Sequence, residues 1–206
     1  MHRWIRRISD RVISKIEAAK PDVIINTLNG TGNLSFFKQM SEKNYTADDY
    51  MTMSFSIAEE EVKTIGADIL EGHMVSWNYY MSTDTPENKA FVEAYQKAYG
   101  SDRVTSDPAE AAYDAVYLWK AAVEKAESFE PEDVIAAVEE GGVTFDAPEG
   151  TVEIDGENHH LIKPVRIGVI NADGQIDTAK ETEPVVPDPY LKSYDWAVKA
   201  DLQPLE

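Results

Sequence analysis

Short apolar runs that alternate with helix-forming segments constrain this chain most. Residues 23–25 form a continuous Val-Ile-Ile run, which is typical of a strand buried on both faces of a parallel sheet. Apolar residues at helical spacing precede it at 9–19, and Pro21 ends that helix because proline disfavours helix in the residue before it. Strand-like segments recur at 50–55 and 74–80. This alternation predicts an α/β fold with right-handed crossovers and a mostly parallel sheet.

The segment after residue 80 carries stronger helix signals. Thr85-Pro86 supplies a cap and a first-turn proline for a helix that ends at Gly100. Asp107-Pro108 does the same for a helix that runs to about Ala126, and Pro131 opens a third helix. Helical spacing places Ala112, Val116, Trp119 and Val123 on one face of the second helix, widened by Ala115 and Ala122. In the third helix it predicts that Val134, Ile135 and Val138 lie inside.

The last quarter of the chain returns to strand-like patterns. Residues 151–180 alternate apolar and polar side chains, and Asn171-Ala172-Asp173-Gly174 is a hairpin turn signal. Three prolines between Glu183 and Tyr190 predict an extended tail. Asp155, Glu157 and His159 would share one face of a strand, an arrangement that also invites a metal site.

Composition excludes several classes of function. The formal net charge of -19 argues against nucleic acid and against an anionic membrane surface, which both require surplus Lys and Arg. The absence of cysteine excludes disulfides, thiolate nucleophiles and cysteine zinc sites. No apolar run approaches the ~20 residues of a membrane-spanning helix. The basic segment Met1–Arg7 lacks the apolar stretch of a signal peptide, so we interpret it as a helix end or a sequence junction.

Nine short strings occur in a fixed order between residues 10 and 190. The strings are Ala18-Ala19-Lys20-Pro21-Asp22, Asn26-Thr27-Leu28-Asn29-Gly30, Ala58-Glu59-Glu60-Glu61-Val62, Trp77-Asn78-Tyr79-Tyr80, Asp84-Thr85-Pro86-Glu87-Asn88, Glu110-Ala111-Ala112-Tyr113, Phe145-Asp146-Ala147-Pro148-Glu149-Gly150, Glu157-Asn158-His159-His160 and Pro187-Asp188-Pro189-Tyr190. Together, in this order and at these spacings, they resemble the urea-binding and short-chain-amide-binding proteins of ABC transporters, which are type I periplasmic binding proteins. Their shared order and spacing, rather than any one string, carries the resemblance.

The resemblance implies a periplasmic-binding-protein-like I fold, with two Rossmann-like lobes, three hinge crossings and a ligand cleft at the C-terminal ends of the strands. It assigns 1–80 to an α/β segment of the second lobe and 86–146 to helices that return to the first lobe. It assigns 151–206 to second-lobe strands and an extended C-terminal tail. Because the family begins with a signal peptide and the sheet of the first lobe, we expect an incomplete two-lobe architecture. Either the chain is truncated at its N-terminus, or a partner chain supplies the missing first lobe.

Urea and small amides are neutral and planar, so their site needs a few placed hydrogen-bonding groups and an apolar or aromatic wall. The resemblance places the loop after the first strand in the cleft, and further polar residues follow the second strand. The predicted ligand-binding residues are Thr27, Leu28, Asn29, Gly30, Ser54, Ser56 and Glu59.

Each of these residues also has a purely structural interpretation. The loop after the first strand is then only a connection, Ser56 caps a helix, and Glu59 stabilises a helix N-terminus. Trp77, Tyr79 and Tyr80 either line the cleft or belong to the core, and we expect core for Trp77. The family carries the Asn158-His159-His160 string outside its cleft, so we interpret it as structural and predict no metal, cofactor or catalytic residue.

The resulting hypothesis is a solute-binding component of an ABC transporter for urea or short-chain amides, working with a membrane permease in the periplasm or outside the cell. No nucleophile or acid–base pair indicates an enzyme. The alternatives are a cytoplasmic amide-sensing regulatory protein, or a truncated chain without full binding activity. If the first-lobe sheet is missing, we expect the chain alone to bind ligand weakly. We also expect the apolar faces of the helices at 86–99 and 107–126 to be either exposed or packed on something else; their residues are Phe91, Val92, Tyr95, Val116 and Trp119.

Overall fold

The computed structural model describes the backbone of residues 2–199 and the side chains of residues 11–198. The chain forms two compact units. Unit 1 comprises Met1–Ala112, Pro148–Gly150 and Val165–Thr182, and unit 2 comprises Tyr113–Ala147, Thr151–Pro164 and Glu183–Glu206. Each unit contains hydrophobic clusters of its own. None of the described helices is both long enough and apolar enough to cross a membrane.

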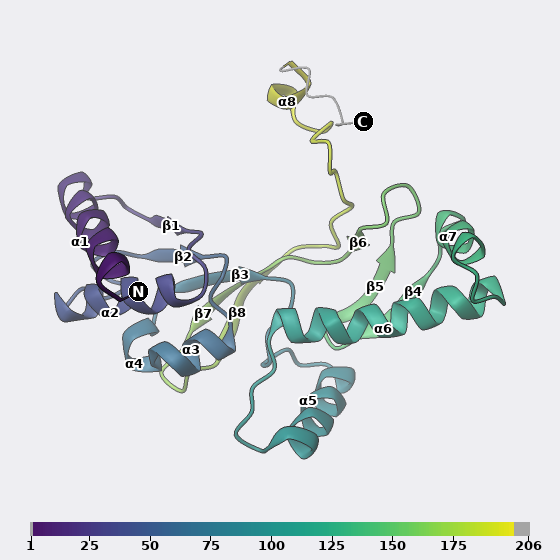
Figure 1. The fold of residues 1–206 in the computed structure, drawn as a ribbon, viewed down its shortest axis with the longest axis horizontal. Helices are drawn as coiled ribbons and strands as arrows, with labels where there is room; N and C mark the ends of the chain where they lie inside the picture. Colours follow the sequence, from purple (N-terminus) through teal and green to yellow (C-terminus); the bar gives the residue numbers. More distant parts are fainter. Residues whose placement is uncertain (1, 200–206) are drawn as a thin grey trace. The chain divides into compact units, whose positions relative to one another are not determined.

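Unit 1 is built on a five-stranded sheet (Figure 1). Its strands are β1 (Ile24–Asn26), β2 (Thr52–Ser54), β3 (Met74–Trp77), β7 (Arg166–Ile170) and β8 (Ile176–Glu181), in the order β1-β2-β3-β7-β8. The first three strands are parallel, whereas β7 runs antiparallel to β3 and β8 antiparallel to β7. The predicted α/β fold is therefore confirmed, with a parallel half and an antiparallel half in one sheet.

Four helices pack on one face of this sheet. They are α1 (His2–Ala19), α2 (Thr31–Glu42), α3 (Glu59–Ile65) and α4 (Ala67–Leu70). All four contribute to one core cluster with Val75 of β3, through side chains that include Ile13, Phe37, Val62 and Leu70. The first helix ends at Ala19, as the following proline predicted. The side chains of the basic segment Met1–Arg7 lie outside the described residues.

The other face of β1 is uncovered, which the sequence did not predict. Ile25 is 62% exposed, although the apolar run 23–25 indicated a strand buried on both faces. Ile25 pairs in register with Met53 and points away from the helices, while its neighbour Asn26 is buried on the helix side. A continuous apolar run shows only that both faces are apolar. It does not show that both faces are covered.

The two remaining helical segments of unit 1 are α5 (Pro86–Tyr99) and the start of α6 (Asp107–Ala126). The Thr85 hydroxyl oxygen accepts from the Asn88 N–H at 3.0 Å, so the predicted cap is confirmed. Phe91 was expected to be either exposed or packed on something else, and it is buried with its ring 6.3 Å from that of Tyr79. The second alternative therefore holds for Phe91, because another part of unit 1 covers this side chain.

Asp107 was predicted to cap α6, and this is wrong because the helix begins at Asp107 itself. The carboxylate oxygen Oδ2 of Asp107 accepts instead from the N–H groups of Asn78 and Tyr79, at 2.9 and 3.0 Å. Asp107 therefore orders the segment that follows β3.

The hairpin between β7 and β8 turns at the predicted residues. The Asn171 side-chain oxygen accepts from the N–H groups of Asp173 and Gln175, both at 3.0 Å, and Gly174 has a positive φ of 77°. Gly168 in β7 allows a close approach, because a Cβ there would lie 2.8 Å from the ring of Tyr80. The absence of a side chain at Gly168 therefore lets β7 pack closely against the Tyr80 ring.

Unit 2 contains most of α6 and a small sheet. Its other elements are α7 (Pro131–Glu139), β4 (Thr144–Ala147), most of β5 (Gly150–Ile154), β6 (Leu161–Ile162) and α8 (Asp195–Lys199), with sheet order β4-β5-β6. The buried face of α6 carries Leu118 and Ala122, which pack in the two clusters of this unit. Val116 and Trp119 lie on the apolar face that helical spacing indicated, and they are 63% and 55% exposed.

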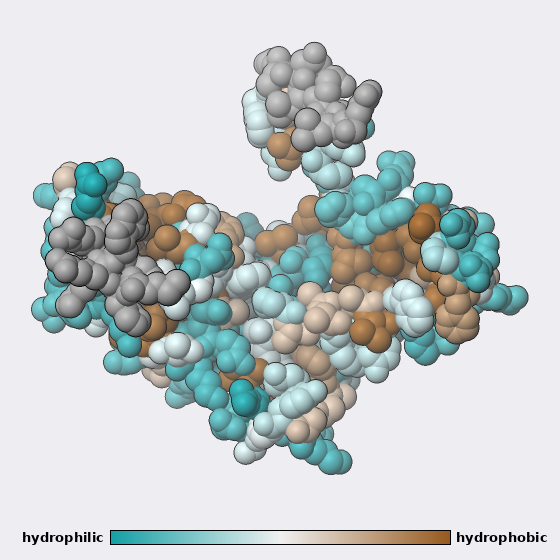
Figure 2. All heavy atoms as spheres, viewed as in Figure 1, coloured by the Kyte–Doolittle hydropathy of each residue, from teal (hydrophilic) through white to brown (hydrophobic). Residues whose placement is uncertain are grey.

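The exposure of Val116 and Trp119 agrees with the expectation that these two side chains are either exposed or packed on something else. Ile135 of α7 was predicted to lie inside and is also exposed. Apolar residues are visible at the surface in Figure 2. The helical spacing on α6 and α7 therefore identified apolar faces correctly, but not which of them the unit covers.

Residues 155–160 form a turn rather than a strand. The Asp155 carboxylate accepts from the N–H groups of Glu157 and Asn158, at 2.9 and 3.2 Å. His159 has a positive φ of 61°. The predicted common face of Asp155, Glu157 and His159 is therefore wrong, and these residues connect β5 to β6.

Candidate functional site

The predicted binding residues lie at one edge of the unit 1 sheet. The strands β1 and β2 are parallel, and Asn26 at the end of β1 pairs in register with Ser54 at the end of β2. Residues 27–30, the first loop, follow β1, and residues 55–58, the second loop, follow β2. Because carboxyl ends of parallel strands meet at one edge, the two loops lie next to each other.

Two buried asparagines connect the strand ends. The Asn26 side-chain nitrogen donates to the Asn33 side-chain oxygen at 2.9 Å and to the Ser54 hydroxyl at 3.0 Å. The Asn26 side-chain oxygen accepts from the Leu28 N–H at 3.0 Å. The Asn33 side-chain nitrogen lies 2.8 Å from the Leu28 carbonyl oxygen and 3.3 Å from that of Ser56. Asn26 and Asn33 were not among the residues that the sequence predicted to bind ligand.

The structure places the two predicted serines inside this network. Ser54 is buried and its hydroxyl accepts from Asn26. The Ser56 hydroxyl donates to the Leu28 carbonyl oxygen and lies 3.2 Å from the Asn33 side-chain nitrogen. The alternative that Ser56 caps α3 is wrong, since Ala58 occupies that position and its N–H is bound by the Glu61 carboxylate at 3.0 Å.

The first loop is open to solvent. Thr27, Leu28, Asn29 and Gly30 are all exposed. Gly30 precedes α2 with a φ of 57° and no side chain caps that helix. The loop therefore offers a ligand a hydroxyl, an amide, an apolar side chain and backbone N–H groups at the positive end of a helix dipole.

Glu59 is buried, unlike the exposed residues of the first loop. It is the first residue of α3, 1% exposed, and its Oε1 accepts from the Met81 N–H at 2.6 Å. Its other oxygen, Oε2, accepts no hydrogen bond from the residues that the structure describes. Burial raises the pKa of Glu59 to about 7. The side chain therefore gains or loses its charge close to neutral pH. Its position at the first residue of α3 also fits the alternative interpretation, in which Glu59 stabilises the helix N-terminus.

The aromatic residues at the end of β3 and directly after it pack in the interior of unit 1. The Trp77 indole N–H donates to the Ile57 carbonyl oxygen at 2.7 Å, and the ring packs against the core cluster, which confirms the expected core position. Tyr79 and Tyr80 are completely buried. The Tyr80 hydroxyl is 3.0 Å from the carbonyl oxygens of both Val75 and Arg166, so Tyr80 links the backbones of β3 and β7.

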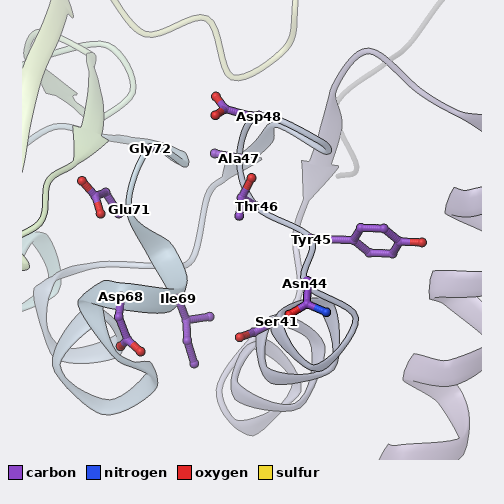
Figure 3. Close-up of a pocket in the computed structure, with 10 residues that line it drawn as sticks. All are labelled: Ser41, Asn44, Tyr45, Thr46, Ala47, Asp48, Asp68, Ile69, Glu71 and Gly72. Carbon is purple, nitrogen blue, oxygen red and sulfur yellow. The ribbon is translucent and has the colours of Figure 1, made fainter.

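A separate surface cavity of about 530 Å³ lies at the other end of the strands (Figure 3). Its lining residues precede β2 and β3 in sequence, and three of them are the acids Asp48, Asp68 and Glu71. None of the predicted binding residues lines it. The cavity, at the amino ends of β2 and β3, and the two loops, at the carboxyl ends of β1 and β2, are thus different regions of unit 1.

Comparison with known proteins identifies similar sequences. The family described as "Periplasmic binding protein domain" matches residues 7–195. The Leu/Ile/Val-binding protein homolog 6 of Brucella abortus is 32% identical over 108 residues, which are 52% of this chain and 27% of that protein. A protein named limonene hydroxylase from Geobacillus stearothermophilus is 32% identical over 123 residues, which are 60% of this chain and 22% of that protein.

Solved structures share the fold. An ABC transporter solute-binding protein from Rhodopseudomonas palustris HaA2, in complex with p-hydroxybenzoic acid, has a TM-score of 0.75 and 27% identity. The match covers 89% of this chain and 51% of that one. A leucine-binding protein from Thermotoga maritima has a TM-score of 0.69 and 23% identity, covering 85% and 48%. This chain therefore spans about half the length of these solved proteins and about a quarter of the two curated relatives.

Proposed function

The chain belongs to the periplasmic binding protein domain family, and we propose that it is part of a non-catalytic solute-binding protein that serves an ABC transporter. In this proposal the protein captures a small molecule in the periplasm or outside the cell and passes it to a membrane permease. The similarity to proteins named as solute-binding and leucine-binding proteins supports this role.

The observation that carries the proposal is the convergence of the first and second loops. The Asn26–Ser54 hydrogen bond and the Asn33 contacts hold two predicted segments at the same edge of the sheet. Open α/β sheets bind ligands outside the carboxyl ends of their strands, which is where these loops lie. Thr27, Leu28, Asn29 and Gly30 are the proposed contacts, because they are the exposed members of the predicted set.

The proposed ligand is urea or a short-chain amide. The seven predicted residues include no lysine, arginine or histidine, and their single acid, Glu59, has a pKa of about 7. A site without a fixed charge suits a neutral ligand, which needs only donors and acceptors such as those of Thr27 and Asn29. We propose that the protein does not hydrolyse this ligand, because the set lacks a nucleophile paired with a base.

A small carboxylate with an apolar body is the second candidate ligand. Leu28 and Phe55 are 42% and 46% exposed, one on each loop, and Leu28 lies three residues before Thr31, where α2 begins without a side-chain cap. Relatives were solved with p-hydroxybenzoic acid or carry the name of a leucine-binding protein. The two candidates differ in charge and in the apolar area that the site would cover.

Calorimetric titration separates these candidates. The complete chain is titrated with urea, acetamide, 4-hydroxybenzoate and leucine, and ammonia release is measured in parallel. Saturable heat with urea or acetamide and no ammonia supports the proposal. If 4-hydroxybenzoate or leucine binds and neither urea nor acetamide does, the ligand is a small carboxylate and not an amide. Ammonia release that scales with protein concentration contradicts a non-catalytic role.

A further inference from the structure

Asn33 belongs to neither loop, yet its side chain bonds to both. It lies in the first turn of α2, is completely buried, and donates from one nitrogen to the carbonyl oxygens of Leu28 and Ser56. We propose that Asn33 is the positioning residue of the binding site, setting the first loop against the second before any ligand arrives. The inference rests on the proposed function only in taking the first loop as the ligand contact.

The amide chemistry explains why asparagine suits this position. Its nitrogen is a donor only, and it faces carbonyl oxygens and the Ser56 hydroxyl. Its oxygen is an acceptor only, and it receives the Asn26 side-chain N–H at 2.9 Å. A buried amide that uses both of its ends in this way fixes one arrangement of its neighbours, since any shift leaves a buried polar group unpaired.

As a consequence, the first loop has two sides: backbone groups of Leu28 face the buried asparagines, and the side chains of Leu28 and Asn29 face solvent. The Leu28 carbonyl oxygen points inward to Asn33, and the Leu28 N–H points inward to Asn26. With its backbone groups held from within, the loop keeps the Leu28 side chain and Asn29 exposed. A site whose loops are ordered in advance loses less entropy when it binds a ligand.

Asn33→Asp tests this role with minimal change in shape. The variant replaces the donor nitrogen by an oxygen that repels the carbonyl oxygens of Leu28 and Ser56. Asn88 provides a matched control in the same unit. Asn88 is also buried, donates to the carbonyl oxygens of Met81 and Thr83 at 2.9 and 2.6 Å, and accepts from a tyrosine hydroxyl. Asn88→Asp therefore removes equivalent bonds away from the two loops.

The first measurement needs no ligand. Amide hydrogen exchange of the complete chain should accelerate by roughly tenfold at Leu28 and Phe55 in Asn33→Asp, the factor that corresponds to the loss of about one hydrogen bond. In Asn88→Asp the same amides should exchange as in the unsubstituted chain. Equal acceleration in the two variants, or no change in Asn33→Asp, overturns the positioning role.

If Asn33→Asp does not fold, Ser56→Ala replaces it in the same experiment. This variant removes one acceptor from Asn33 and one donor to Leu28 while leaving the core intact. Faster exchange at Leu28 supports the inference, and unchanged exchange overturns it.

The second measurement links position to binding. If urea or acetamide binds the unsubstituted chain, Asn33→Asp should weaken the affinity by roughly tenfold or more, and Asn88→Asp should not. Unchanged affinity in Asn33→Asp overturns the positioning role in binding. If neither probe binds the unsubstituted chain, the amide ligand fails, whereas the exchange experiment still decides whether Asn33 orders the loops.

Discussion

The guanidinium of Arg166 and the carboxylate of Glu149 meet inside unit 1, with Nη1 3.7 Å from Oε2 and both side chains almost completely buried. Nη2 of Arg166 also donates to the Glu149 carbonyl oxygen at 2.8 Å. The same side chain donates to the carbonyl oxygen of Asn78 and to the carboxylate of Glu181. Arg166 thereby joins the end of β3, the short segment Pro148–Gly150 and β8.

Arg166→Met should strongly destabilise unit 1. The substitution leaves the Glu149 carboxylate buried beside an apolar side chain, and removing one partner of a buried ion pair costs about 3–5 kcal/mol. The free energy of unfolding, measured in guanidinium chloride, should fall by that order. Lys89→Met is the control, because its pair with Asp84 at 2.7 Å is exposed and is expected to contribute only about 0–1 kcal/mol. Equal losses in the two variants would contradict the role of Arg166.

The buried carboxyl of Glu59 predicts a pH-dependent stability. Burial raises its pKa from 4.5 to about 7, so the folded chain holds this proton more tightly than the unfolded chain. The favourable effect of protonation is complete below pH 4.5 and is lost as pH rises through about 7. Glu59→Gln keeps an oxygen for the Met81 N–H and removes the charge. The free energy of unfolding of Glu59→Gln, relative to that of the unsubstituted chain, should therefore increase by up to roughly 3 kcal/mol as pH rises from 4.5 to about 7.

Guanidinium denaturation at a series of pH values checks this prediction. Glu60→Gln, on the same turn of α3, controls for the loss of one negative charge. A stability difference between Glu59→Gln and the unsubstituted chain that stays constant with pH would exclude the titration of Glu59 as its cause.

The fold was predictable where a signal and its partner lie close together in sequence. Thr85 bonds to a residue three positions away, and Asn171 organises its own turn, so cap and hairpin signals predicted both. Arg166 bonds to Asn78, which is 88 positions away in the sequence, and to Glu149, which is 17 positions away. No local sequence pattern identifies such distant partners. Asp107 shows the same difference between local and distant partners. The helix-start signal predicted the helix correctly, but it did not predict that the Asp107 carboxylate binds the Asn78 N–H, 29 positions away.

The candidate site was predictable only in part for the same reason. Strand–loop patterns and the family resemblance indicated Thr27, Asn29 and Ser54, because carboxyl ends of parallel strands share one edge. Asn33 carries no comparable signal, except that asparagine is a poor choice for a helix interior. Its function in the network depends on Ser56, 23 positions away, and becomes evident only when both loops are placed.

Substitutions in the first loop should weaken ligand binding. Asn29→Leu removes an exposed donor and acceptor, and a ligand polar group left unpaired costs about 1–3 kcal/mol. Gly30→Val should also disturb the loop, because Gly30 has a φ of 57° that a β-branched residue adopts with strain. Calorimetry with urea or acetamide measures the loss. Thr64→Leu, an exposed change on α3, is the control, and unchanged affinity in both loop variants would remove this loop from the site.

The exposed face of α6 should promote self-association. Val116 and Trp119 are mostly exposed, and the Trp119 ring lies 6.2 Å from that of the exposed Phe129. Burying one such side chain is favourable by roughly 1.5–3 kcal/mol. Sedimentation velocity should show a size that increases with concentration, and Trp119→Gln should reduce this increase while Lys120→Gln does not. A monomer at every concentration would contradict the prediction.

Chemical-shift mapping of the 206-residue chain shows directly whether ligand binds at the carboxyl ends of β1 and β2. Backbone amide shifts are recorded while urea or acetamide is added, because this method detects weak binding and locates it. We predict saturable shifts at residues 27–31 and 54–56, no comparable shifts around the cavity at Asp48 and Glu71, and no release of ammonia. Shifts confined to that cavity, or no saturable shift in the two loops, would contradict a ligand site at the carboxyl ends of β1 and β2.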